Sequence, residues 1–384
     1  MTKIISTSTD QLSKITPPRL EAIDGLRGVA CLMVVAHHCY FHGGRYAYPE
    51  LNIGSWKTIA LSQILFYGYS GVELFFVLSG FCLAYPILNR LPQTPNWRRY
   101  FVSRIRRIYP PFLIAMVLFG ICAWLIQYLQ VEPFFSARVL AIPSFRQFIY
   151  SILFISLSFN TSFWTLCVEW RWYFVLPLLI TLYFRFKMLG ILAFTTSVSL
   201  FYVFFIQSSN SEQVKFLLSP LPLFLPVFAL GIWSAELATS KHKSTGTDFI
   251  IQNIRWGCLA SLFFLLIVVP REPNLNLTFS RAIPFGLLYF FVVLAAIYDP
   301  VIRQILSWKP LVILGEFSYS LYLIHLPLIH AAYSVTQKLN WSPATQFLFY
   351  QGAFLPFCIL LGYLFYQVAE KPFLRQRTTI NLKV

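Results

Sequence analysis

Long apolar runs alternate with short polar segments along most of the chain, and ten of the runs match a membrane-crossing helix in length. Such a helix needs about 20 mostly apolar residues. The ten predicted spans are 22–42, 68–88, 109–130, 163–184, 188–207, 216–238, 250–270, 281–298, 318–336 and 345–369. A further apolar run, 147–159, is too short to cross a bilayer, so we expect it to lie at the interface or to re-enter the membrane. The pattern predicts an all-α fold, a polytopic membrane helix bundle of about ten transmembrane helices.

The composition argues against a soluble domain. Charged residues form 11% of the 384 residues and hydrophobic residues 57%, with a mean hydropathy of +0.65. Soluble domains carry roughly 25% charged residues, so this chain lacks the polar side chains that would cover a core of this size. We expect a polar N-terminal tail over 1–20, one transmembrane domain over 21–370 and a basic C-terminal tail over 371–384.

The 30 Lys and Arg residues are divided unevenly between the two predicted sides of the membrane. If the N-terminus lies in the cytoplasm and the spans alternate, most of these residues fall in cytoplasmic segments. This bias follows the positive-inside rule and predicts that both termini are cytoplasmic. Basic residues that face anionic lipid also explain the formal net charge of +16. Membrane lipids are therefore expected partners, and nucleic acid is not.

The first predicted span carries two ionisable residues at membrane depth, Arg27 and His38. Ionisable side chains are costly there and therefore indicate function. Their separation is close to three helical turns, so the two side chains share one face and lie about 16 Å apart along the axis. Asp24, one turn before Arg27, is a candidate partner for it. An ion pair between them at the start of the helix is the alternative to a functional role.

Two carboxylates, Glu73 and Glu169, lie near the outer ends of the second and fourth predicted spans, at a depth comparable to that of His38. General-base chemistry uses a His beside a carboxylate, because the carboxylate fixes the tautomer and stabilises the imidazolium. We therefore predict His38, Glu73 and Glu169 as catalytic residues. For Glu169, the alternative is an ion pair with Arg171, which lies two residues away on a different helix face.

A basic run, Trp97–Pro111, leads into the third predicted span from the cytoplasmic side. Arginine forks bind phosphate well, and Arg104 and Arg107 share one helix face at the interface. These two residues are candidates to bind a phosphorylated ligand. The alternative is an ordinary positive-inside flank.

The ninth predicted span contains His325, with Tyr319 and Tyr322 within two turns before it and Pro327 just after it. Proline removes a helical hydrogen bond and favours a local break. Tyr319 and His325 are candidates to line a channel, and a packing histidine at a kink is the alternative.

Six segments resemble, in the same order, the motifs of the acyltransferase 3 family, whose members are polytopic enzymes that acylate cell-surface sugars and small glycosides. The segments are Ile23–Ala30 with His38, Val72–Phe81, Arg104–Pro110, Phe163–Pro177, Ser318–His325 and Glu370–Pro372. Each segment alone is a weak signal, but six in order are specific. Because the family is chiefly bacterial, the resemblance implies a multi-pass protein of a bacterial inner or plasma membrane.

The resemblance implies an O-acyltransferase that moves an acyl group, with acetyl expected, from a cytoplasmic acyl-CoA to a hydroxyl of a cell-surface or extracellular saccharide or glycoside. The donor-binding residues predicted on this basis are Arg27, Arg104, Arg107, Tyr319 and His325. His38 is predicted as general base or transient acyl carrier, oriented by Glu73, while Trp164, Tyr173 and Glu169 shape the acceptor pocket. Acyl-CoA, in the simplest case acetyl-CoA, is the co-substrate. No permanently bound cofactor and no metal is expected.

Two other classes of protein are compatible with charges at membrane depth. A transporter or flippase of an amphipathic solute predicts solute flux that is independent of acyl-CoA. A membrane sensor or scaffold without acyl transfer predicts that the loss of His38 is tolerated as long as the helices still pack.

Overall fold

The computed structural model describes residues 20–43, 64–91, 94–129, 145–154, 163–206, 221–239, 247–268 and 278–374, and the regular secondary structure in these ranges is helical. The all-α prediction is therefore confirmed for this part of the chain. The two predicted tails lie almost entirely outside the described residues.

The helices cover nearly all of the described ranges. In chain order they are α2 (Glu21–Gly43), α4 (Gly71–Leu88), α5 (Trp97–Tyr128), α7 (Phe145–Ile152), α8 (Trp164–Phe201), α10 (Leu221–Thr239), α11 (Thr247–Val268), α12 (Thr278–Tyr298), α13 (Pro300–Leu306), α14 (Lys309–Glu316), α15 (Ser318–Thr336), α16 (Pro343–Phe347) and α17 (Leu355–Phe365). Short 3₁₀ or π-helical segments adjoin them: η2 (Tyr67–Ser70), η5 (Tyr202–Ile206), η6 (Leu348–Phe354), η7 (Tyr366–Glu370) and η8 (Lys371–Phe373).

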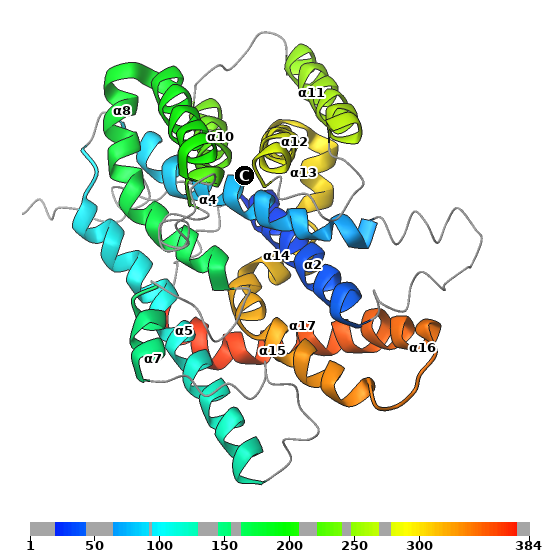
Figure 1. Cartoon of the computed structure of the whole chain (residues 1–384). Helices are drawn as coiled ribbons and strands as arrows, with labels where there is room; N and C mark the ends of the chain where they lie inside the picture. Colours follow the sequence, from blue (N-terminus) through cyan, green and yellow to red (C-terminus); the bar gives the residue numbers. More distant parts are fainter. Residues whose placement is uncertain are drawn as a thin grey trace, which may run out of the picture.

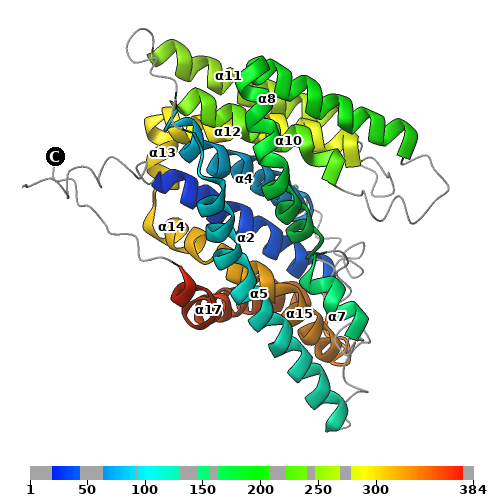
Figure 2. The same cartoon turned by 90° about the vertical axis from the view of Figure 1, so that its left-hand side faces the viewer.

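Helix α2 runs through the middle of the bundle, between α4 on one side and the α14–α15 pair on the other (Figures 1 and 2). Leu26, Ala30 and Val34 recur every four residues, which places them on one helix face, and all three are buried in the main core. Cys31 and Val35, on another side of the helix, are buried in a second cluster formed with α15, η6 and α17. Because α2 is buried on more than one side, Arg27 and His38 lie within the bundle, where each is partly buried.

Six helical stretches in the described residues are long and apolar enough to cross a membrane, and the number rises to eight if each of two bent pairs counts as one span. The six are Glu21–Phe41, Ile64–Leu88, Trp97–Tyr128, Trp164–Phe205, Leu221–Thr239 and Pro343–Phe373. The bent pairs are Ala282–Tyr298 with Pro300–Leu306 and Lys309–Glu316 with Ser318–Thr336. The structure thus supports a multi-pass membrane bundle, but it does not confirm a count of about ten.

Helix α8 accounts for part of the difference in the count. The fourth and fifth predicted spans, 163–184 and 188–207, fall in one helical stretch of 42 residues. Lys187 interrupts that stretch with a positive φ of 57°, and the ribbon of α8 turns sharply partway along (Figure 1). At 1.5 Å per residue the arm before Lys187 is about 34 Å long, enough to cross a hydrocarbon layer of about 30 Å. The break therefore falls where the hydropathy pattern separated two spans.

The outer surface of the bundle is apolar, as a protein in lipid requires. On α5, Val117, Ile121 and Trp124 are exposed, and on α17 Leu360 and Leu364 are exposed as well. A soluble monomer rarely leaves large contiguous apolar surfaces in water. These side chains are accommodated if the surrounding medium is the bilayer interior.

Helices α4 and α10 meet with their backbones in close approach. A Cβ placed on Gly231 of α10 would collide with the carbonyl oxygen of Val77, and one on Gly80 of α4 would collide with that of Phe228. Small residues at such crossings allow membrane helices to approach closely. The contact holds α4, which carries Glu73, against the rest of the bundle.

We expect Gly231→Ala to lower the stability of the folded protein in detergent by about 1–3 kcal/mol, the usual cost of overpacking a tight contact. The reason is that the added methyl group meets the Val77 carbonyl, so α4 and α10 must separate. The measurement is the temperature at which half of the protein leaves the monodisperse size-exclusion peak. Gly120→Ala in α5 is the matched control, since a Cβ there has nothing within 4 Å. Equal melting of both variants would contradict this account.

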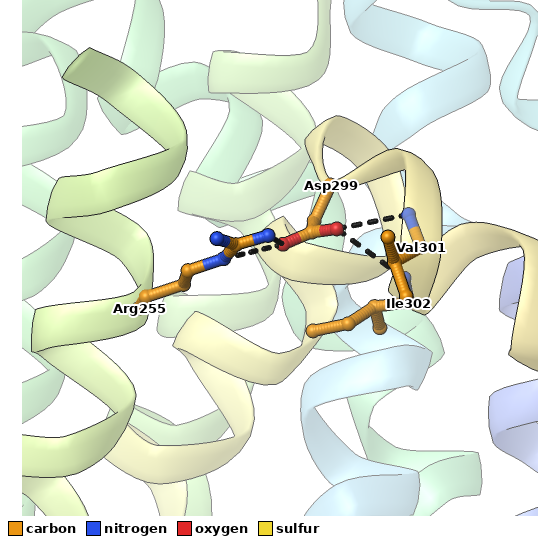
Figure 3. A network of polar contacts seen from close by, with 4 residues as sticks. All are labelled: Arg255, Asp299, Val301 and Ile302. Atoms are coloured by element: carbon orange, nitrogen blue, oxygen red, sulfur yellow. Dashed lines mark hydrogen bonds and ion pairs between the residues drawn. The ribbon is translucent and has the colours of Figure 1, made fainter. Parts of the chain in front are cut away.

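A polar network fixes the sharp bend between α12 and α13 (Figure 3). The Asp299 carboxylate caps α13 by accepting hydrogen bonds from the backbone N–H groups of Val301 (2.9 Å) and Ile302 (3.3 Å). Its other oxygen accepts from Arg255 of α11, with Nε at 2.8 Å and Nη2 at 2.7 Å. The side chain of Asp299 is fully buried, so the ion pair ties α11 to a bend of 96°. The bend directs α13 onto α2, where the Leu306 carbonyl lies against Gly25.

Candidate active site

A cavity that is partly open to the surroundings lies between helices α2, α4, α5, α8 and α15. Segments from five parts of the chain thus converge on it. Its lining is Arg27, Val72, Phe75, Phe76, Leu78, Ser79, Cys82, Leu83, Arg104, Arg107, Ile108, Thr165, Leu166, Glu169, Tyr173, Ser318, Tyr319 and Tyr322. Six of the ten predicted site residues are in this lining, which brings together side chains that are up to 292 positions apart (Arg27 to Tyr319).

Three arginines give the cavity a positive charge. Arg27 comes from α2, while Arg104 and Arg107 come from one face of α5, as their spacing predicted. Among the described residues none of the three forms a direct ion pair, and the alternative pair of Arg27 with Asp24 is not made. The Arg104 guanidinium lies over the rings of Tyr100 and Tyr173, at 5.7 and 5.9 Å from their centroids. The guanidinium groups are therefore available to an anion that enters the cavity.

Glu169 is the one carboxylate in the cavity lining. Its Oε1 accepts a hydrogen bond of 2.8 Å from the hydroxyl of Tyr173, one turn further along α8. The alternative ion pair with Arg171 is not formed among the described residues. Three arginines and one glutamate leave the lining with a formal charge of +2 (three positive charges less one negative).

His38 and His325 are in contact, although 287 residues separate them. The Nε2 atom of His325 lies 3.2 Å from Nδ1 of His38, and Nδ1 of His325 lies 2.7 Å from the backbone carbonyl oxygen of Tyr322. His325 is fully buried, whereas His38 is half-buried. Neither histidine is in the cavity lining, but Tyr322 is, and its ring centroid lies 5.2 Å from that of His325.

The other predicted site residues lie in the cavity lining or elsewhere in the bundle. Tyr319 lines the cavity and donates a hydrogen bond of 3.0 Å to the carbonyl of Ile108, which anchors α15 to α5. Glu73 is buried in the first turn of α4, within electrostatic range of Tyr289, and is not in the lining. Trp164 packs on Phe76 and Phe224 and is also not in the lining.

Two polar contacts, one in the cavity lining and one outside it, could not be predicted from residue spacing. Thr165 donates a hydrogen bond of 2.7 Å to the hydroxyl of Tyr322, which joins α8 to α15. Glu370 is buried and accepts a hydrogen bond of 2.6 Å from Ser320, and it lies within electrostatic range of Arg107. The only sequence signal for the second contact was the resemblance of the segment Glu370–Pro372 to a family motif.

The structure is thus a bundle of apolar helices around a cationic cavity, with two histidines in contact beside it. The chain belongs to the acyltransferase 3 family, because the profile of that family's acyltransferase domain matches residues 20–363. The family predicted from the six sequence segments is confirmed.

Relatives include an acetyltransferase from a bacterium. The O-acetyltransferase OatA of Staphylococcus aureus (strain NCTC 8325 / PS 47) is 29% identical over 358 residues, which cover 83% of this chain and 52% of OatA. The protein ORF330 of Acidianus two-tailed virus is 27% identical over 303 residues, which cover 78% of this chain and 81% of ORF330. The chain thus spans about half the length of OatA. No solved structure matches it.

Proposed function

We propose that this chain transfers an acyl group, acetyl in the simplest case, from an acyl-CoA to a hydroxyl of a cell-surface or extracellular saccharide or glycoside. The cationic cavity is the observation that carries the proposal. Three arginines line it inside an apolar bundle, and acyl-CoA combines an anionic, phosphorylated end with a thioester at the end of a flexible arm. The acyltransferase family and the name of OatA support the same reaction class.

The donor is proposed to bind with its phosphates at Arg27, Arg104 and Arg107. Arginine forks recognise phosphate oxygens by paired, charge-assisted hydrogen bonds, and this lining carries an excess of positive charge. The bias of basic residues towards one side supports entry from the cytoplasm, with both termini on that side. Tyr319 would shape the wall of the donor site, because it lines the cavity and is held by the Ile108 carbonyl.

His38 is proposed as the general base. Arg27 and His38 lie on one continuous helix, about 16 Å apart along its axis, so an extended arm could connect phosphates at one end with a thioester near the other. The acceptor oxygen attacks the thioester carbonyl while its proton passes to His38. The carbon–sulfur bond then breaks, and His38 returns the proton to the leaving thiolate to give free CoA. An acyl group carried transiently on His38 is the two-step alternative.

Three predicted residues are proposed to shape the acceptor pocket, namely Glu169, Tyr173 and Trp164, and Glu73 is proposed to act on His38. Glu169 and Tyr173 are hydrogen-bonded to each other at the cavity wall and are suited to bind hydroxyl groups. Trp164 packs against Phe76, which lines the cavity, and could support that wall. Glu73 is buried near the start of α4 and is proposed to stabilise positive charge on His38.

The test uses purified protein in lipid nanodiscs with radiolabelled acetyl-CoA, in the presence and absence of an extract of bacterial cell-surface glycans. We expect thioester turnover that depends on the extract and label that appears in a glycan fraction. Uptake of a solute that does not depend on acetyl-CoA would instead support a transporter. Folded protein with no turnover of acetyl-, succinyl- or longer acyl-CoA would contradict the proposal.

A further inference from the structure

We propose that His325 is a positioning residue, which holds the His38 imidazole in the one tautomer that can act as a base through Nε2. The inference rests on the proposed function and adds a role at the same centre. The juxtaposition that carries it is a chain of two contacts, from the Tyr322 carbonyl to His325 and from His325 to His38.

The first contact decides which nitrogen of His325 carries the proton. Its Nδ1 lies 2.7 Å from the carbonyl oxygen of Tyr322. A carbonyl oxygen only accepts hydrogen bonds, so the nitrogen that faces it must carry the hydrogen. A neutral imidazole has one N–H, and its second nitrogen then carries a lone pair. His325 therefore presents Nε2 as an acceptor.

The second contact determines which ring nitrogen of His38 carries the proton. Nε2 of His325 lies 3.2 Å from Nδ1 of His38. Because the nitrogen of His325 is the acceptor, Nδ1 of His38 must be the donor and carry its proton. The lone pair of His38 then lies on Nε2, the opposite ring nitrogen. The backbone of α15 thus sets the tautomer of a side chain on α2.

Because His325 is buried, we infer that it does not contact the substrate directly. It is fully buried, both of its ring nitrogens are engaged, and it is not in the cavity lining. Tyr322, whose ring centroid lies 5.2 Å from that of His325, does line the cavity, and its hydroxyl accepts a hydrogen bond from Thr165. A donor in the cavity as described would therefore contact Tyr322 and not His325.

The arrangement also stabilises His38 when it accepts a proton. The acceptor hydroxyl loses its proton to Nε2 of His38, and the resulting imidazolium keeps its Nδ1–H directed at Nε2 of His325. The proton leaves again from Nε2 to the departing sulfur, so His325 neither gains nor loses one. In the Ser-His-Asp catalytic triad, a carboxylate orients the histidine. Here a neutral imidazole orients the ring, and a carboxylate such as Glu73 would act only on the charge of the imidazolium.

The test compares three substitutions in the nanodisc assay with acetyl-CoA. His325→Ala should lower kcat by about 10- to 100-fold, a part of the 10²–10⁴-fold that a general base contributes, and should leave KM for acetyl-CoA unchanged. His325→Gln should recover much of this loss, because its side-chain oxygen can accept from Nδ1 of His38. His330→Ala, five residues further along α15, is the matched control and should retain wild-type turnover.

The outcomes distinguish this inference from the proposed function. Wild-type turnover that requires His38 but persists in His325→Ala overturns the positioning role alone. A raised KM with unchanged kcat assigns His325 to donor binding and overturns it as well. Absence of turnover in the wild type overturns both. If His325→Ala does not fold, ¹⁵N spectra of histidine-labelled wild type decide the question, since the role requires the His38 signal to show a protonated Nδ1.

Discussion

Replacement of His38 by alanine is expected to lower the turnover of acetyl-CoA by about 10²- to 10⁴-fold, the range for loss of a general base. The binding of CoA should be nearly unchanged, because His38 is not in the lining of the cavity that holds the arginines. The measurement is single-turnover loss of label from acetyl-CoA in nanodiscs, with the dissociation constant of CoA determined by calorimetry on the same preparations.

Two further variants show whether this loss is chemical. His38→Gln retains a polar side chain of similar size that cannot accept a proton at neutral pH, so it should be as inactive as His38→Ala. Turnover by His38→Gln close to that of the wild type would show that position 38 contributes packing or a hydrogen bond rather than proton transfer. His330→Ala serves as control for the loss of a half-buried histidine elsewhere in the bundle.

The second large effect is expected from Arg107→Gln, which should weaken acetyl-CoA binding by about 10- to 100-fold. A hydrogen bond to a charged group contributes about 1.5–3 kcal/mol, and each 1.4 kcal/mol corresponds to a factor of ten in affinity. Arg107 lines the cavity, and no described carboxylate is in direct ion-pair contact with it. The measurement is KM for acetyl-CoA together with the dissociation constant of CoA.

An acyl donor without phosphate groups tests whether Arg107 binds the phosphates of CoA. S-acetyl-pantetheine lacks the phosphates of CoA, so its KM should be high and equal in the wild type and in Arg107→Gln. Arg106→Gln is the matched control, because Arg106 is exposed and adjacent on α5 but not in the cavity lining. Equal weakening for both donors would indicate that Arg107 maintains the fold around Glu370 and does not bind phosphate.

Much of the fold could be predicted from the chain itself, because apolar runs of about 20 residues have few stable alternatives to membrane helices. Each predicted run that is described by the structure lies on a helix. The count of spans was harder to predict, because hydropathy does not show whether consecutive helices form one crossing. Helix α8 with its break at Lys187 and the bent pairs around Asp299 and Phe317 illustrate this.

The candidate site, too, could be predicted from the sequence only in part. Arg104 and Arg107 share a face by helical spacing, and Arg27 is costly at membrane depth, so all three could be found by local reasoning. Their convergence with Glu169, Tyr173 and Tyr319 on one cavity required the packing of five helices. Trp164, predicted to shape the acceptor pocket, is not in the lining of this cavity and packs on Phe76 and Phe224.

The sequence by itself therefore determined the helical membrane fold, the family and the cationic residues, since these depend on residue type and on spacing within one helix. Only the tertiary structure decided which histidine faces which partner. His38 and His325 meet because α2 and α15 pack side by side, and no periodicity within either helix specifies that contact. Hydrogen bonds between distant helices depend on the relative position and rotation of both, and these are properties of the packed bundle rather than of any single segment.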